Sequence, residues 1–191
     1  MRLIILCCLL LSSLTANAKD IAKEIAGVMV QETLQTENGT LLHLNGAGIR
    51  SKFFFDIYIA ELYMEHPSKM VNEVIETSGD KRIVMHFLYD EVGKDKLIEG
   101  WNEGFAGNSN ADVVVTLQER IDTFNGMFDD VKKGDTIVLD FIPDQGTMVT
   151  VAQQEKGLIP GKDFNDALLR IWLGEKPVTK GLKEKLLSYK R

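Results

Sequence analysis

Short apolar runs separated by turn residues fill the first half of the chain and predict β-strands. Residues 28–34 and 41–44 flank Asn38-Gly39, a dipeptide typical of tight turns, and so predict a β-hairpin. Residues 49–64 are rich in β-branched and aromatic side chains and predict one or two further strands. Residues 81–89 place apolar side chains at alternate positions, which predicts another strand with an apolar face.

The pattern then changes to the spacing of helices. Residues 70–75 predict a short helix, and residues 97–105 and 114–128 repeat apolar side chains at helical intervals, so they predict two amphipathic helices. Residues 137–152 alternate again around the turn at Asp144-Gln145-Gly146. This last segment predicts a second hairpin.

The C-terminal region predicts two more helices. Asp163 is placed as an N-cap, a continuous apolar stripe runs from there to Trp172, and Gly174 ends the helix. Residues 179–188 predict a final polar helix. Because strands and helices are segregated along the chain, the fold class is α+β. An antiparallel sheet with helices packed on one face is the simplest architecture, since the strands alternate instead of being apolar throughout.

Composition agrees with an ordinary globular domain. The 191 residues are 45% hydrophobic and 26% charged with four prolines, which excludes disordered, collagen-like and coiled-coil proteins. The 22 Lys and Arg residues are outnumbered by 28 Asp and Glu residues, which gives a formal charge of −6. This acidic balance argues against a nucleic-acid partner.

Residues 1–18 have the pattern of a secretory signal peptide. Arg2 is followed by an apolar run over residues 3–11 and by the small residues Ala16-Asn17-Ala18, where cleavage is expected. Both cysteines, Cys7 and Cys8, lie in this segment. We therefore expect a periplasmic or secreted protein without disulfides, which folds as one domain over residues 19–191. No later segment has the ~20 apolar residues of a membrane span.

Motifs of cofactor and metal sites are incomplete in this sequence. Gly46-Ala47-Gly48 lacks the third glycine of a dinucleotide loop, because Ser51 takes that position and a strand follows. The histidines, His43, His66 and His86, are far apart and form no paired ligand motif. We therefore predict no cofactor, no metal and no catalytic residue.

One strand segment carries polar side chains among apolar ones. Arg50, Tyr58 and Tyr63 lie within residues 45–63, where a buried guanidinium needs a partner or a polar ligand. In a straight strand, Arg50 and Tyr58 would share a face but lie ~26 Å apart, whereas Tyr63 would face the other side. A bend within residues 51–55 is needed to bring Arg50 and Tyr58 together. The structural alternative is an ion pair of Arg50 at the sheet edge with both tyrosines in the core.

The sequence resembles the bacterial exported chalcone isomerase-like proteins. The resemblance covers nearly all of the chain after the signal peptide, and the matching motifs taken together are specific for this family. The matching features are Gly48-Ile49-Arg50-Ser51-Lys52, residues 58–63, Gly100-Trp101 to Gly104-Phe105, Lys133-Gly134-Asp135, Pro143 with Gly146, and Gly161 through Ile171-Trp172-Leu173-Gly174. The resemblance implies an open-faced β-sandwich, in which a large antiparallel sheet carries helices on one face.

Relatives with this fold include plant enzymes that close a chalcone to a flavanone and plastid proteins that bind fatty acids. In both groups an arginine faces the ligand cleft, and it matches Arg50. Tyr58 looks like the tyrosine that helps to hold the carboxylate in the fatty-acid binders. The sequence departs from the enzymes, since it lacks their tyrosine after the strand ending near Tyr89 and has Trp101 about where they have an asparagine.

The main hypothesis is an exported, monomeric, non-catalytic protein that binds a fatty acid or another small apolar carboxylate, with Arg50, Tyr58 and Tyr63 as ligand-binding residues. The alternative is an intramolecular lyase or isomerase, in which Arg50 stabilises a developing oxyanion and a tyrosine or water relays the proton. A third reading is an envelope protein that binds a partner and has a closed core. An apolar cavity beside Arg50 separates the first two readings from the third.

Overall fold

The computed structural model describes residues 23–190, so the signal peptide expected at residues 1–18 lies outside the described part. A seven-stranded sheet forms the centre of the fold, in the spatial order β11-β10-β9-β6-β5-β4-β3. All of its neighbouring strands are antiparallel. In chain order, its strands are β3 (Thr33–Gln35), β4 (Leu41–Lys52), β5 (Phe55–Met64), β6 (Lys81–Phe87), β9 (Thr136–Ile142), β10 (Gly146–Val151) and β11 (Gln154–Pro160).

Short strands and helices complete the fold. Two small antiparallel pairs are formed by β1 (Lys23–Ile25) with β2 (Val28–Val30) and by β7 (Glu91–Val92) with β8 (Val131–Lys132). The helices are α1 (Val71–Glu76), α2 (Lys94–Asn108), α3 (Ala111–Asn125), α4 (Lys162–Leu173) and α5 (Lys180–Leu186). Within residues 23–190, none of the helices is long and apolar enough to cross a membrane.

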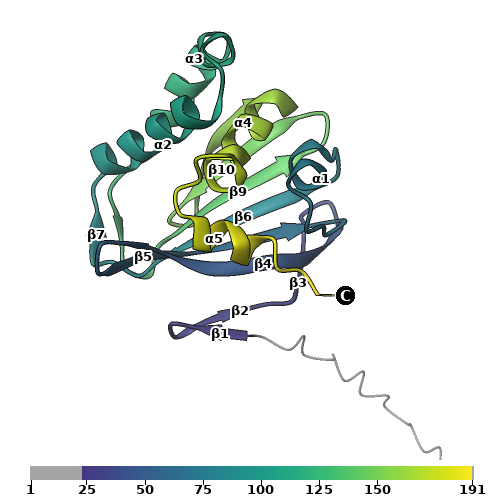
Figure 1. The fold of residues 1–191 in the computed structure, drawn as a ribbon, viewed down its shortest axis with the longest axis vertical. Coiled ribbons are helices and arrows are strands. Elements are labelled where there is room, and N and C mark those ends of the chain that lie inside the picture. Colours follow the sequence, from purple (N-terminus) through teal and green to yellow (C-terminus); the bar gives the residue numbers. More distant parts are fainter. Residues whose placement is uncertain (1–22, 191) are drawn as a thin grey trace, which may run out of the picture.

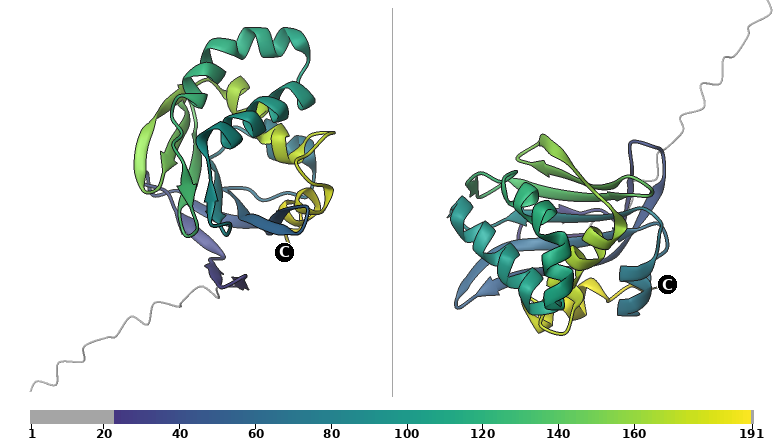
Figure 2. Two further views of the ribbon diagram at one scale, coloured as in Figure 1. Left: turned by 90° about the vertical axis from the view of Figure 1, so that its left-hand side faces the viewer. Right: turned by 90° about the horizontal axis from the view of Figure 1, so that it is seen from above.

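The helices cover one face of the sheet, and the sheet curls around α4 and α5 (Figures 1 and 2). The main core fills the space between this face and the helices, and α4 supplies much of it because eight of its residues are buried. A small cluster of Leu42, Tyr63 and Val84 lies on the opposite face. The predicted α+β class and the large antiparallel sheet with helices on one side are confirmed.

The glycine-rich segment of β4 is where α5 approaches the sheet. A Cβ atom at Gly46 would lie 2.0 Å from the carbonyl oxygen of Lys185, so the side chain of any other residue would push α5 away. Asn45, at a register shift of β4 against β5, donates from Nδ2 to the carbonyl of Leu186 at 2.7 Å. Asn45 and Gly46 therefore hold the C-terminal helix against the sheet. This packing explains the glycine-rich segment, so no nucleotide-binding loop is needed to explain it.

Several details differ from the sequence prediction. The strand predicted over residues 28–34 is split into β2, which pairs with β1, and β3, which pairs with β4. The N-cap of α4 is Gly161, whereas Asp163 lies in the first helical turn and accepts two hydrogen bonds from Arg120, at 2.7 and 2.6 Å. A carboxylate in the first turn stabilises the positive N-terminal end of the helix dipole, as a carboxylate at the N-cap position does. An aspartate near the start of a helix therefore does not distinguish the two positions in the sequence. The sequence pattern does not predict strand β11, because this edge strand buries only Ile159 fully and so lacks a clear alternation.

Candidate functional site

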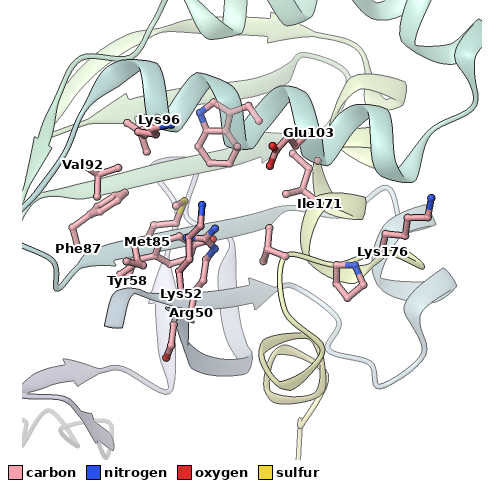
Figure 3. A pocket seen from close by; sticks show the side chains of 18 residues that line it. Arg50, Lys52, Tyr58, Met85, Phe87, Val92, Lys96, Glu103, Ile171 and Lys176 are labelled. Carbon is pink, nitrogen blue, oxygen red and sulfur yellow. The ribbon is translucent and has the colours of Figure 1, made fainter. Parts of the chain in front are cut away.

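A cavity of about 400 Å³ opens between helix α2 and the strands β4, β5 and β6. Figure 3 shows Lys96 and Glu103 on the helix above it, with Arg50, Lys52, Tyr58 and Met85 on the strands below. The remaining wall comes from Ile171 of α4 and from the residues 176–178 that connect α4 to α5. The volume lies within the range of small-molecule sites in proteins.

A hairpin with a bulge brings Arg50 and Tyr58 together. The chain turns at residues 53–54, and Lys52 pairs with Phe55 and Ser51 with Asp56. In a regular hairpin the next pair would be Arg50 with Ile57, but the register shifts there and Arg50 lies opposite Tyr58. Cross-strand partners present their side chains on the same face, so the bulge aims both groups into the cavity. The predicted bend within residues 51–55 is confirmed.

Arg50 lies without a carboxylate partner in the part of the chain that the structure describes. Its guanidinium carbon lies 5.6 Å from the centre of the Tyr58 ring, a cation–π contact that leaves the N–H donors available. The ion pair of the structural alternative is therefore absent among residues 23–190, whereas both tyrosines lie in the core, as that alternative expected. A half-buried cation without an anion is suited to bind an anionic ligand.

Tyr58 is buried, with 5% of its surface exposed, and its hydroxyl group is oriented by the core. The oxygen accepts a hydrogen bond of 3.0 Å from Trp172 Nε1. Within residues 23–190 its own proton has no acceptor, so this O–H group is free to donate to a ligand. Burial raises the pKa of Tyr58, although Arg50 and the Trp172 hydrogen bond act in the opposite direction. The hydroxyl group therefore stays protonated near neutral pH.

The cavity has an apolar interior and a charged mouth. Its buried lining residues are apolar or aromatic, and they include Met85, Phe87, Leu97, Trp101 and Ile171. The exposed charged residues of the lining are Lys52, Lys96 and Lys176, with Glu103 as the acidic member. With Arg50 added, basic groups outnumber acidic ones around the opening. This charge distribution favours a ligand with an anionic head and an apolar body.

Tyr63 lies on the other face of the sheet and does not contribute to this cavity. Its hydroxyl group lies 2.8 Å from Glu61 Oε2 and 3.0 Å from the carbonyl oxygen of Gln31. Burial, together with the charge of Glu61, raises its pKa. His86 Nε2 is 3.0 Å from the other oxygen of Glu61, so this face holds a separate polar cluster. The structure thus brings together two of the three predicted ligand-binding residues.

Sequence reasoning did not assign three residues that matter at the site. Trp172 belongs to the apolar stripe that predicts helix α4, and its indole N–H also orients Tyr58. Trp101 lines the cavity, and its buried Nε1 has no hydrogen-bond partner in the described part of the chain. Gly100 lines the cavity where a Cβ atom would meet no atom within 4 Å. The N–H group of a buried tryptophan normally has a hydrogen-bond partner. A tryptophan within a predicted apolar stripe therefore indicates a polar group nearby in the core.

Comparison with known proteins agrees with this architecture. A family model described as chalcone isomerase-like matches residues 22–188. The structure is similar to the crystal structure of a fatty-acid binding protein from Arabidopsis thaliana, with a TM-score of 0.60 and 15% sequence identity over 82% of this chain and 96% of that one. No curated protein sequence matches this chain. Because the family model spans almost the whole described chain, the protein belongs to the chalcone isomerase-like family.

Proposed function

We propose that this protein binds a small apolar carboxylate such as a fatty acid and does not catalyse a reaction. The observation that carries the proposal is that one cavity holds an arginine without an ion pair and a tyrosine whose O–H group has no acceptor, both judged within residues 23–190. The fold is shared with a protein named for fatty-acid binding, which supports the same class of ligand. At 15% identity this likeness concerns the fold, so the ligand argument depends on the site itself.

In the proposed complex, the carboxylate accepts hydrogen bonds from the guanidinium of Arg50 and from the hydroxyl group of Tyr58. The first of these bonds is charge-assisted and so is stronger than a neutral one. Trp172 donates to the Tyr58 oxygen, which polarises the O–H group toward the ligand. The apolar chain then lies against the buried side chains of the cavity, where removal from water provides most of the binding free energy.

The chemistry of Tyr58 favours binding over proton transfer. A general base needs a pKa close to the working pH, whereas burial raises the pKa of Tyr58 above its ordinary value. Glu103, the carboxylate among the lining residues, is exposed at the mouth. The lining therefore offers hydrogen-bond donors for a bound anion and no buried base next to it.

We also propose that the protein works after export. The apolar run and small residues of residues 1–18 support cleavage of a signal peptide and release to the periplasm or the outside of the cell. Mass spectrometry of the protein purified from an exported fraction measures this directly. We expect the mass of a chain that begins at residue 19. The mass of a chain that still contains residues 1–18 would contradict the proposal.

A substitution that fills the cavity tests the proposed binding. Gly100→Leu adds a side chain at a position where a Cβ atom meets nothing within 4 Å and which lines the cavity. Gly107→Leu is the matched control, because it lies on the same helix, also has open space at Cβ and does not line the cavity. Both changes replace a helical glycine, so both should stabilise α2 by a similar amount, about 0.8–1 kcal/mol.

Native mass spectrometry and calorimetry with lipid-stripped protein provide the measurement. We expect the wild type and Gly107→Leu to bind fatty acids of medium chain length, whereas Gly100→Leu loses binding and keeps its fold. A lipid-stripped wild type that ignores fatty acids over a broad range of chain lengths contradicts the proposal. Equal affinity of the two leucine variants would place the ligand elsewhere.

A further inference from the structure

The tip of the β4–β5 hairpin exposes three consecutive phenylalanines. Phe53, Phe54 and Phe55 are 87%, 99% and 55% exposed, and the ring of Tyr89, itself 38% exposed, packs against Phe55 with ring centres 5.4 Å apart. The tip lies at the edge of the molecule, below β7 in Figure 1. Side chains this exposed contribute little burial to the fold, so the stability of the domain does not explain them.

The geometry of the turn does not explain these aromatic residues either. Phe53 and Phe54 form the two-residue loop, and Phe53 has a φ angle of 57°, in the left-handed region. Two-residue hairpin loops favour glycine, asparagine or aspartate at such positions, since bulky residues there are strained. A phenylalanine at position 53 therefore lowers the stability of the fold and exposes apolar surface to water. Both effects indicate that these side chains contact an apolar surface outside the protein.

This aromatic tip (Phe53, Phe54, Phe55 and Tyr89) adjoins the mouth of the cavity. Arg50, Ser51 and Lys52 line the cavity, and the tip begins at the next residue. Lys96 lies across the mouth on α2 (Figure 3). The mouth is therefore basic, although the whole chain carries a formal charge of −6. A partner surface that contacts the aromatic tip would therefore also contact Lys52 and Lys96, and it would lie opposite the cavity mouth.

We propose that the aromatic tip docks the protein on a phospholipid bilayer, with the cavity mouth turned toward the lipid. Aromatic side chains are favoured at the membrane interface, and lysines beside them complement lipid phosphates. A protein partner or a second copy fits less well. A second copy docked through the same tip would bring two basic cavity mouths together, which like charges disfavour, whereas lipid phosphates carry the complementary charge.

Docking in this orientation gives an apolar carboxylate a route between bilayer and cavity. The head of the ligand would pass Lys52 and reach Arg50 without full exposure of its chain to water. This part of the inference rests on the proposed ligand, whereas docking of the tip on lipid does not. The two are therefore measured separately.

Flotation of the protein with phosphatidylethanolamine–phosphatidylglycerol vesicles tests the docking. The double variant Phe53→Gly, Phe54→Ser removes two aromatic rings and places glycine where φ is positive, so the hairpin should keep its fold. Its matched control is Met70→Ser, Val115→Ser, which removes two apolar side chains that are 62% and 75% exposed and lie outside the tip and the cavity lining.

We expect the wild type and the control to float with the vesicles, and the tip variant to bind at least about tenfold more weakly, as loss of apolar burial predicts. Affinity for dissolved fatty acid should be equal in all three proteins, because the changed residues do not line the cavity. Equal vesicle binding by tip variant and control, or no flotation of the wild type, overturns the proposal. A dimer in light scattering that the tip variant abolishes also overturns it, since the tip would then bind a second copy. Failure to bind fatty acid, with vesicle binding intact, contradicts only the proposed function.

Discussion

Replacement of Arg50 by glutamine should weaken ligand binding by about tenfold or more and leave the empty protein nearly as stable as before. Arg50 has no ion-pair partner within residues 23–190, so its loss strands no carboxylate. The free energy of unfolding of the lipid-stripped variant should stay within about 1 kcal/mol of the wild type, because the change removes only the cation–π contact with the Tyr58 ring. Had Arg50 completed a buried ion pair, the same change would cost about 3–5 kcal/mol.

The expected effect on binding follows from the hydrogen bond that Arg50 donates to the carboxylate in the proposed complex. A hydrogen bond to a charged group contributes about 1.5–3 kcal/mol, so the affinity for fatty acid should fall by about 10- to 150-fold. A ligand at 100 times its dissociation constant stabilises the wild type by about 2.7 kcal/mol. With a hundredfold weaker affinity the same ligand concentration stabilises the variant by only about 0.4 kcal/mol.

Thermal melts with and without fatty acid measure both quantities. The ligand should raise the melting temperature of the wild type by roughly 5–10 °C and that of Arg50→Gln by about 1–2 °C. Arg82→Gln is the matched control, because Arg82 pairs with Asp140 on the opposite face of the sheet, with Nη2 3.0 Å from Oδ2. It should lose about 1–3 kcal/mol of stability and keep the full ligand shift. A large stability loss in stripped Arg50→Gln, or an undiminished ligand shift, would refute the reasoning.

Further predictions concern the ligand chain, the hydroxyl donor and a buried lysine. Calorimetry over a series of fatty acids should show affinity rising about fourfold per methylene group until the cavity is filled, then a plateau, and a flat series would contradict an apolar cavity site. Tyr58→Phe should weaken fatty-acid binding about five- to tenfold and also cost about 1–3 kcal/mol in stripped protein, because Trp172 Nε1 loses its acceptor; unchanged stability in urea titrations would argue against that bond. Burial lowers the pKa of Lys81 to about 8, so between this pH and about 10.4 the unfolded chain binds more protons and stability rises with pH, by up to about 3 kcal/mol. Urea titrations should show this rise in the wild type and not in Lys81→Met, and parallel curves would contradict it.

Much of the fold could be predicted because the strands alternate strongly and the helices repeat apolar residues at helical intervals. The hairpin at Asn38-Gly39, strand β6, helix α4 and the end of α4 at Gly174 all follow from such local signals. Strand β11 could not be predicted, since its position at the sheet edge removes the need for a fully apolar face. The local hydrophobic pattern thus reflects which side chains are buried, so an element with few buried side chains has no clear pattern.

The candidate site was only half accessible to sequence reasoning. The even spacing of Arg50 and Tyr58 predicts a shared face only in a straight strand, whereas a regular hairpin through Lys52 and Phe55 would pair Arg50 with Ile57 and turn Tyr58 away. The bulge restores the shared face by adding one residue to β5. A bulge has no distinct sequence signal here, so the geometry that creates the site was not predictable from the residue types alone.

The hydroxyl donor of the site is positioned by the core rather than by its neighbours in sequence. Trp172 lies 114 residues after Tyr58 and is fully buried, with its ring 5.8 Å from that of Trp101. The same indole therefore packs the helices together and fixes the direction of the Tyr58 O–H group. A donor that is already oriented needs little ordering when a ligand arrives, which lowers the entropic cost of binding. In the proposed complex the arginine supplies the charge and the packed core supplies the geometry, so a site with few polar groups would suffice to select a carboxylate.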